Sequence, residues 1–414
     1  MTKAKNILII TSCAFRLLLD YCYKYAISPI YSYAGFEYIP NKESYIISWV
    51  VLLLFIMLVQ PFIKIGNTFV GMFALIIYFV RFIPITSFYA CYYQPIDCFL
   101  LNSIFYAVLF VFLYFFLFRF RGDYNVVKSS NMVFIVVMIL ALNIVFISGY
   151  YSHFRLNFSL TNVYDLRFEA RDYNIPLLLK YLWNAGNNII PIFVVYYLEK
   201  KKKIIAYLLI FVSLLNFGIN GLKTTLFKVI LCVILYKCYR RSFVNYIGLF
   251  LVILVSFALM WFYFLNDTII SDIIVRRVFF MPARLDFCFY EYTLQNGLVY
   301  MNSELADKLT FDIGAIYMHE GVRANNGMFS DAYARFGIMG VFFYPILISL
   351  FCAWCGKAIN RLNESIKFYV ALIFAVTLMG SAFTTCLLTH GLMLTVVVLM
   401  MLPKTQTIKK SINS

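Results

Sequence analysis

The stretch RRVFFMPARLDFCFYEYT (276–293) lies in the longest break in an otherwise nearly continuous series of apolar segments. The break runs from Asn266 to Gly340 and also contains HEGVRANNGMFSDAYARFGIMG (319–340). Apolar runs of about 18 or more residues, long enough to cross about 30 Å of hydrocarbon, recur before and after it. The sequence therefore predicts a membrane protein whose largest polar unit is held at one face of the bilayer.

Composition indicates the same class of protein. The 414 residues are 63% hydrophobic and 13% charged, whereas a soluble domain is about half apolar and a quarter charged. No small-residue cleavage site follows the first apolar run, so we expect a retained span rather than a signal peptide that is removed. The ten cysteines and three histidines show no metal-ligand spacing, and no metal site is predicted.

Apolar periodicity predicts about twelve transmembrane helices, and hence an all-α polytopic membrane protein. The predicted spans cover residues 7–27, 45–63, 67–88, 98–118, 131–150, 183–198, 204–219, 222–239, 243–265, 337–356, 366–383 and 386–402. Along the chain we expect five spans in 1–150, a first long loop at 151–182, four spans in 183–265, a large loop at 266–336, and C-terminal spans with a tail at 337–414.

The basic residues predict the orientation. One set of loops holds nineteen Lys and Arg residues against three acids, and the opposite set holds twelve against sixteen. Because basic residues favour the cytoplasmic side, we expect both termini in the cytoplasm and the two long loops outside. The basic residues are spread over many short loops, which argues against nucleic acid as a partner. Outside, eight Arg accompany four Lys; Arg suits two-pronged binding of phosphate, although these arginines could also simply pair with the outer acids.

In the first long loop, a predicted helix over 162–173 carries its charges on separate faces. Asp165, Glu169 and Asp172 fall on one face, and Arg167 and Arg171 fall on another. A helix built for its own stability would interleave the signs, because like charges at this spacing cost about 0.2–0.5 kcal/mol per pair. The segregation predicts an anion for the arginines and a base or sugar-hydroxyl role for the carboxylates. A docking face for the second loop is the alternative.

In the large loop, Arg277 and Arg284 are seven residues apart and share a face if the segment is helical. The aromatic residues around them indicate an amphipathic element at the membrane surface, where Arg suits a lipid-linked phosphate. Arg276 is explained equally well as an anchor in the headgroup region. His319, which has a carboxylate beside it, is a candidate proton acceptor, and Glu169 is the other candidate. Four further polar residues are predicted to support the site or to bind sugar: Asp165, Arg323, Asn326 and Asp331.

Three segments of these loops resemble the O-antigen polymerase (Wzy-type) family of bacterial inner-membrane proteins. They read VYDLRFEAR (163–171), RRVFFMPARLDF (276–287) and NGMFSDAYARFGIMG (326–340). The family pattern of many spans with two long periplasmic loops is also similar to the whole chain. The resemblance implies a multi-pass protein of the bacterial inner membrane that belongs to the membrane-embedded C-type glycosyltransferase superfamily.

The resemblance further implies an enzyme that needs no nucleotide-sugar, metal or other cofactor. Such an enzyme transfers a growing glycan from one undecaprenyl pyrophosphate onto a sugar hydroxyl of the next lipid-linked repeat unit. A polysaccharide chain-length regulator is an expected partner. On matching positions the pyrophosphate would fall to Arg167, Arg171, Arg277 and Arg284, and the site would lie at the periplasmic face between the two loops.

Two other functions stay open. An O-antigen ligase or another lipid-linked glycosyltransferase would share the fold and the phosphate chemistry. A flippase or transporter of the lipid-linked oligosaccharide belongs to a different class, in which internal repeats and ionisable residues in mid-membrane are common. The sequence shows no internal repeat, and Arg16, Arg81 and Lys228 are its only evident intramembrane charges, so transport is the less favoured function.

Overall fold

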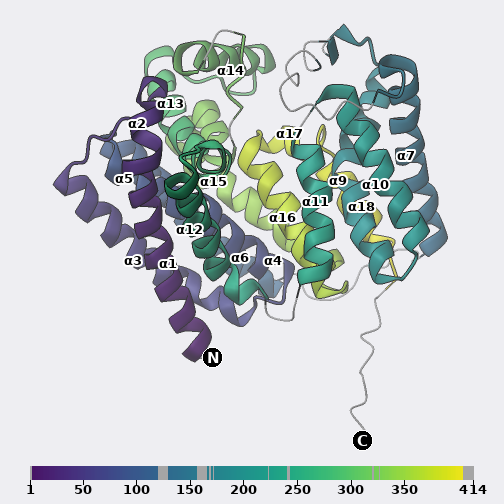
Figure 1. The fold of residues 1–414 in the computed structure, drawn as a ribbon, viewed down its shortest axis with the longest axis horizontal. Coiled ribbons are helices and arrows are strands. Elements are labelled where there is room, and N and C mark those ends of the chain that lie inside the picture. The colour runs from purple at the N-terminus through teal and green to yellow at the C-terminus, as the bar shows by residue number, and fades with distance from the viewer. Residues whose placement is uncertain are drawn as a thin grey trace, which may run out of the picture. The chain divides into compact units, whose positions relative to one another are not determined.

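The structure is a computed structural model that describes residues 2–119, 129–155, 166, 169–170, 172–221, 223–239, 243–318, 321–325 and 327–403 (Figure 1). Every regular element among these residues is a helix. The predicted all-α class is therefore confirmed for the described part of the chain.

The chain divides into two compact units, each built from separate stretches of sequence, and each is described by itself. Unit 1 contains Met1–Arg121, Ser242–Trp354 and Ala375–Phe383, and unit 2 contains Gly122–Arg241, Cys355–Phe374 and Thr384–Ser414. The first long loop of the sequence thus belongs to unit 2 and the large loop belongs to unit 1. The division into five consecutive segments and the site between the two loops stay predictions.

Unit 1 begins with the helices of the N-terminal part. These are α1 (Thr2–Cys22), η1 (Tyr23–Ile27), α2 (Ser28–Tyr31), η2 (Ser32–Ala34), α3 (Lys42–Lys64), α4 (Phe69–Ile77), η3 (Tyr78–Phe82), α5 (Ile83–Cys91) and α6 (Ile96–Arg119). Later stretches add η4 (Phe243–Tyr246), α12 (Ile247–Leu265), η5 (Ser271–Phe280), α13 (Met281–Asn296), α14 (Ser303–Tyr317) and most of α15 (Met328–Ile359). Three of these elements, η1, η3 and η5, are π-helical, and η5 contacts both of the others.

Unit 2 is centred on one buried helix. Its elements are α7 (Ser130–Ser152), α9 (Leu177–Glu199), α10 (Lys203–Asn220), α11 (Lys223–Cys238), α18 (Leu392–Met400) and most of α17 (Phe383–Leu387), while α16 (Glu364–Gly380) contributes residues to both units. α9 packs against α7, α10, α11 and α18. Every residue of α9 from Asn188 to Leu198 is buried as a result.

Nine helices of the described residues are long and apolar enough to cross a membrane. They cover Lys3–Ala34, Lys42–Lys64, Phe69–Cys91, Ile96–Arg119, Ser130–Ser152, Lys203–Asn220, Phe243–Leu265, Met328–Ile359 and Phe383–Met400. The chain is therefore a multi-pass membrane protein. The other three predicted spans coincide with α9, α11 and α16. Of these, α11 and α16 have only 16 and 17 residues, short of the about 20 that a span needs, so the count of twelve stays a prediction.

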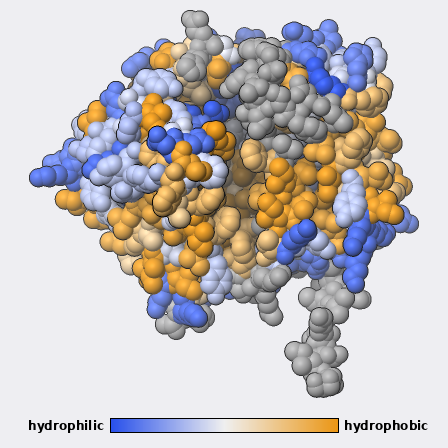
Figure 2. All heavy atoms as spheres, viewed as in Figure 1, coloured by the Kyte–Doolittle hydropathy of each residue, from blue (hydrophilic) through white to orange (hydrophobic). Residues whose placement is uncertain are grey.

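Large apolar side chains lie exposed along these helices. On α12 they include Phe250, Ile253, Phe257 and Phe264. Figure 2 shows hydrophobic residues gathered over the middle of α1 and α12, with hydrophilic residues above and below them in that view. Contiguous exposed apolar surface of this kind is unusual on a soluble protein and is suited to contact with lipid.

Side-chain caps fix where several helices begin. Asn41 accepts a hydrogen bond from the backbone N–H of Glu43 at 3.0 Å at the start of α3. Asn302 accepts one from the backbone N–H of Glu304 at 2.9 Å at the start of α14. A cap of this kind satisfies an N–H group that has no partner inside the helix and contributes about 1 kcal/mol.

Most of the described residues between Asn266 and Gly340 are helical. Figure 1 shows α13 and α14 at the end of unit 1 away from the N-terminus. α13 follows η5 directly and packs against α14, and α15 then begins at Met328 and bends at Gly337, where φ is 56°. An apolar cluster joins these helices, formed by Leu285, Cys288, Phe289, Leu309, Ile313 and Ala334.

Candidate functional site

Two arginines, one in η5 and one in α13, lie over the same aromatic ring. The guanidinium carbons of Arg276 and Arg284 lie 5.8 and 5.4 Å from the centre of the Phe36 ring. Arg276 also lies 4.2 Å from the ring centre of Tyr31. Both arginines are only 8% exposed, and Phe36 is fully buried. Because the face of an aromatic ring attracts a cation, the segment 31–36 holds both positive charges in one place.

The π-helical geometry of η5 determines which arginine faces Phe36. In a regular α-helix Arg277 would share a face with Arg284, as the sequence predicts. A π-helix has a wider turn, which changes the residues that share a face. Arg277 is instead 53% exposed and donates to Asp272 at 2.9 Å. Arg276 also pairs with Asp272, and Arg276 rather than Arg277 is the neighbour of Arg284.

Arg284 carries a nearly buried positive charge. Its Nη1 donates to the backbone carbonyl of Tyr317 at 2.9 Å. No ion pair joins Arg284 to a carboxylate in the part of the chain that the structure describes. A buried charge without an opposite partner is costly, since it loses its hydration without compensation. The arrangement therefore leaves Arg284 able to attract an anion.

Gly35 leaves the space that the guanidinium of Arg284 occupies. A Cβ at this position would lie 2.3 Å from Nη2 and 2.6 Å from Cζ of Arg284. The backbone of Gly35 also has a φ of +72°, in the left-handed region that costs other residues about 1–2 kcal/mol. Both the backbone and the close approach of Arg284 favour glycine.

The segment that carries Gly35 is held against the end of α5. The backbone N–H of Ile39 donates to the carbonyl of Cys91 at 3.0 Å, and the N–H of Tyr93 donates to the carbonyl of Ile39 at 3.1 Å. The hydroxyl of Tyr23 donates to the carbonyl of Glu37 at 3.0 Å. These bonds fix the position of the aromatic ring beneath the two arginines.

Asp286 anchors α13 in the helix bundle. It lies two residues after Arg284 and so points to another side of the helix. Its fully buried carboxylate lies 2.8 Å from Nη2 of Arg81 in η3. It also accepts hydrogen bonds from Asn102 at 3.0 Å and from Ser330 at 2.7 Å. These contacts join α13 to η3, α6 and α15 and thereby fix where Arg284 stands.

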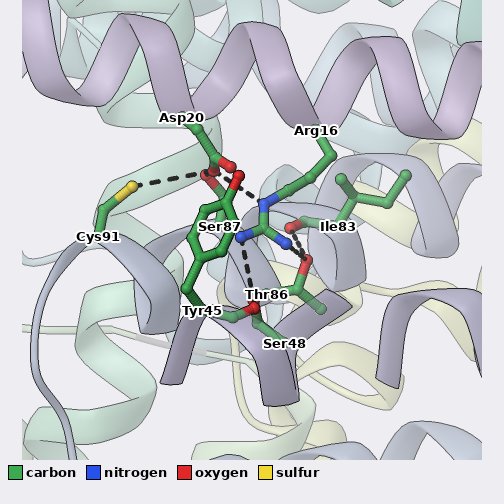
Figure 3. A network of polar contacts seen from close by, with 8 residues as sticks. All are labelled: Arg16, Asp20, Tyr45, Ser48, Ile83, Thr86, Ser87 and Cys91. Carbon is green, nitrogen blue, oxygen red and sulfur yellow. Dashed lines mark hydrogen bonds and ion pairs between the residues drawn. The ribbon is translucent and has the colours of Figure 1, made fainter. Parts of the chain in front are cut away.

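A second buried network of polar contacts surrounds Arg16 and connects helices of unit 1 (Figure 3). Arg16 of α1 donates to Asp20 at 2.8 Å, to Thr86 at 3.2 Å and to Ser48 at 3.2 Å. The network links α1, α3 and α5, and α5 continues directly from η3. The charge of Arg16 is matched inside the chain, which is how charged residues are usually accommodated within a membrane.

A carboxylate lies two helical turns along α13 from Arg284. Glu291 is half-buried, and the hydroxyl of Tyr317 donates to its Oε2 at 3.4 Å. Partial burial raises the pKa of Glu291 above its ordinary value. Burial also raises the pKa of Tyr317, to about 12. A carboxylate with increased proton affinity and an arginine open to an anion therefore lie on one helix.

Two other predicted residues of the large loop have protein partners. Arg323 donates to Asp307 through both Nη atoms, at 2.9 and 3.0 Å. Asp331 lies 2.7 Å from Nε of Arg335 and accepts a hydrogen bond from the backbone N–H of Phe383 at 3.1 Å. Both residues therefore hold neighbouring segments together.

Glu169 is the predicted site residue of the first long loop that the structure describes. Its carboxylate accepts hydrogen bonds from Arg155 at 2.7 Å and from the hydroxyl of Tyr173 at 2.7 Å. The bond from Arg155 is the main reason why the pKa of Glu169 is lowered, and this makes Glu169 a weaker proton acceptor. The remaining predicted residues lie outside the described residues: Asp165, Arg167, Arg171, His319 and Asn326.

The sequence did not single out Gly35, Phe36 or Glu291. The first two lie in a short connection far along the chain from Arg284, and only tertiary structure brings them together. Glu291 follows Arg284 by seven residues, the same helical spacing that drew attention to Arg277. That spacing is the signal that could have identified it. For Asp286, the signal was Arg81, because a charge inside a span needs a partner.

Comparison with protein-family models, with curated proteins and with solved structures found no match to this chain. Among the described residues, no group of three or more His, Cys, Asp or Glu side chains could hold a metal ion. The candidate site therefore consists of Arg276, Arg284 and Glu291, with the groups that position them.

Proposed function

We propose that the chain polymerises lipid-linked oligosaccharide repeat units at the outer face of a bacterial inner membrane. In each cycle it transfers the growing glycan from one undecaprenyl pyrophosphate onto a hydroxyl of the next lipid-linked unit. The product is O-antigen or a related surface polysaccharide, and a chain-length regulator is an expected partner. The sequence resemblance suggests this reaction, and the chemistry of the arginine site supports it.

The observation that carries the proposal is the environment of Arg284. Its charge is nearly buried and has no carboxylate partner among the described residues. A guanidinium presents its N–H donors in a planar fork that matches two oxygens of a phosphate. Nη1 of Arg284 donates to the carbonyl of Tyr317, and its guanidinium carbon lies over the Phe36 ring; these two contacts hold the fork in position. The remaining donors suit the oxygens of a pyrophosphate.

Arg276, which Asp272 holds in place, brings a second guanidinium to the same ring as Arg284. When the glycosyl C–O bond breaks, negative charge develops on the pyrophosphate that leaves. A preorganised donor aimed at such a charge contributes roughly 2.7–4 kcal/mol to the stability of the transition state. Phe36 already holds both arginines in place. Their side chains therefore need to move little when negative charge develops on the pyrophosphate. Arg277 is proposed as a further contact, with Arg323 and Asp331 in support. The predicted roles of Arg167, Arg171 and Asn326 fall on residues outside the described part of the chain.

A lipid-linked substrate suits the position of the site. α13 is not among the candidate membrane-spanning helices, and it lies at the end of unit 1 away from the N-terminus (Figure 1). A pyrophosphate can therefore meet the arginines while its polyprenyl chain stays in the bilayer. We assign this end to the periplasm and both termini to the cytoplasm, because Lys3, Lys5 and Lys64 belong to the opposite, basic set of loops.

Replacement of Arg284 by Lys tests the proposal. Lys keeps the charge but loses the two-pronged contact, so chain growth should fall about 10²- to 10³-fold, as for the loss of one preorganised donor. The variant is expressed in a strain that lacks the gene, and the surface polysaccharide is resolved on a lipopolysaccharide gel. The ladder should collapse to core plus one repeat unit, while the amount and melting temperature of the protein stay close to those of the parent.

Arg119→Lys is the matched control for this substitution. Arg119 is exposed and ends α6, in the set of loops opposite to the site. This variant should produce the full ladder. A full ladder from Arg284→Lys as well would remove Arg284 from phosphate binding and, with it, the observation on which the proposal rests.

A deletion strain separates the proposed reaction from its two rivals. Loss of a polymerase leaves core capped by a single repeat unit. Loss of a ligase leaves uncapped core with finished polymer still on its lipid carrier, and loss of a flippase leaves uncapped core with single lipid-linked units. Core capped by one repeat unit supports polymerisation. Either of the other two patterns would contradict it and would indicate a ligase or a flippase instead.

A further inference from the structure

Glu291 and Arg284 are two turns apart on one face of α13, and a single residue of α14 contacts both. The side chain of Tyr317 donates to Glu291 Oε2 at 3.4 Å, and its backbone carbonyl accepts from Arg284 Nη1 at 2.9 Å. The two charged groups therefore stand near each other without pairing. In a glycosyl transfer the leaving phosphate and the attacking hydroxyl lie on opposite sides of the anomeric carbon. The groups that bind them must therefore be close to each other but not paired, as Arg284 and Glu291 are.

Few charged or titratable groups act on Glu291. They are Arg284 and Cys288 on α13, Tyr317 on α14, Tyr92 after α5 and Cys98 on α6. Arg284 is the one cation in this set. No ion pair holds Glu291 among the described residues. Its carboxylate is thus available to a ligand, apart from the long hydrogen bond from Tyr317.

We propose that Glu291 is the proton acceptor of this site and binds the hydroxyl of the incoming sugar. The inference rests on the proposed function. The hydroxyl oxygen forms the new bond to the anomeric carbon, and the bond from that carbon to the pyrophosphate breaks. The hydroxyl proton passes to Glu291, and the electron pair of the broken bond leaves with the undecaprenyl pyrophosphate that Arg284 binds.

Glu291 suits this role better than Glu169. Arg155 and Tyr173 both donate to Glu169 at 2.7 Å, so its pKa is lowered and its oxygens are engaged. Glu291 has one long hydrogen bond, and burial raises its pKa. A general base works best when its pKa approaches the working pH. Glu291 has the higher pKa and the fewer hydrogen bonds of the two, so it is the stronger proton acceptor.

The first test is Glu291→Gln in the full chain reconstituted in lipid vesicles. The probe is the lipid-linked repeat unit that accumulates in the deletion strain, extracted and supplied to the vesicles. Loss of a general base should slow chain growth about 10²- to 10⁴-fold, without a change in melting temperature. Glu291→Asp, which keeps a carboxylate, should recover part of the rate. Glu304→Gln, at an exposed position of α14, should leave the rate unchanged.

The second test uses the dependence of rate on pH. Activity requires ionised Glu291, and the hydrogen bond from Tyr317 and the charge of Arg284 both lower its pKa against the effect of burial. Tyr317→Phe removes the hydroxyl but keeps the backbone carbonyl that accepts from Arg284. The pKa of Glu291 should rise, and the acidic limb of the rate profile should move to higher pH. A purely structural role of Tyr317 would lower the rate without moving the limb.

The outcomes separate the inference from the function on which it rests. If Arg284→Lys abolishes growth while Glu291→Gln grows normally, Glu291 is not the base and the polymerase proposal stands. If both variants grow normally, the proposed function itself fails. An unchanged acidic limb in Tyr317→Phe, together with a slow Glu291→Gln variant that melts at a lower temperature, would reduce Glu291 to a structural residue.

Discussion

At the scale of single residues, Gly35 offers a way to move the guanidinium of Arg284 without changing Arg284. In Gly35→Ala the new methyl group would lie 2.3 Å from Nη2, so the guanidinium must shift because it is the flexible end of a long side chain. The backbone adds about 1–2 kcal/mol of strain. We expect a small loss of stability but a loss of chain growth close to that of Arg284→Lys, measured by thermal unfolding and by the polysaccharide ladder.

Gly297→Ala is the matched control for Gly35→Ala. Gly297 also has a positive φ, of +85°, but nothing lies within 4 Å of its missing Cβ. With ψ of 178° its backbone lies in a region essentially restricted to glycine, whereas Gly35 is left-handed with ψ of 37°. The backbone strain of Gly297→Ala is therefore at least as large, without any collision with an arginine. This variant should lose stability and keep its ladder. If Gly35→Ala and Gly297→Ala give the same polysaccharide ladder, the position of the Arg284 guanidinium beside Gly35 does not affect activity.

The contrast between Arg284 and its surroundings shows what a sequence can predict at this scale. Arg284 is identified by its type and by its place in a loop beside apolar spans. Its partners Phe36 and Tyr317 come from distant segments, and neither carries a local signal of that contact. Glu169 shows the opposite case, because its segregated face suggests a ligand whereas the structure gives it Arg155. Residue types were predictable here, and pairings were not.

At the scale of elements, the ion pair between Asp286 and Arg81 holds α13 on η3. In Asp286→Asn the amide can still accept from Ser330, but Arg81 loses the charge that compensates its burial. Removal of one partner of a buried ion pair costs about 3–5 kcal/mol. We therefore expect a clear fall in melting temperature, and a fall in chain growth because α13 carries Arg284.

A double substitution checks that explanation. Arg81→Met with Asp286→Leu removes both charges together, and such replacements are often neutral or stabilising. The double variant should therefore melt at a higher temperature than Asp286→Asn alone. If it melts lower still, the hydrogen bonds from Asn102 and Ser330, rather than the ion pair, hold α13 in place.

Element type was largely predictable, and element geometry was not. Long apolar runs have to become helices in lipid because every backbone polar group must find a partner within the segment. The same rule does not choose between α- and π-helical turns. η5 contacts η1 and η3, and packing of this kind leaves no mark in the local sequence SDIIVRRVFF (271–280). That is why the sequence pointed to Arg277 where the structure turns Arg276 towards Phe36.

At the scale of the whole molecule, the orientation of unit 1 decides which substrates can reach Arg284. Among the ten cysteines, Cys238 is the exposed one, so Cys238→Ser provides a background of low reactivity. On it, Glu304→Cys should react in intact cells with a maleimide that crosses the outer membrane but not the inner one. Lys3→Cys should react only after lysis. The charge asymmetry of the loops predicts this result, and labelling is read by a mass shift on a gel.

The reverse pattern would carry a definite consequence. It would put Arg284 and Glu291 in the cytoplasm, where sugars are supplied on nucleotides. The reaction would then be an assembly or transport step of the lipid-linked unit, because polymerisation as proposed requires both units at the outer face. Orientation thus decides between two uses of the same arginine chemistry.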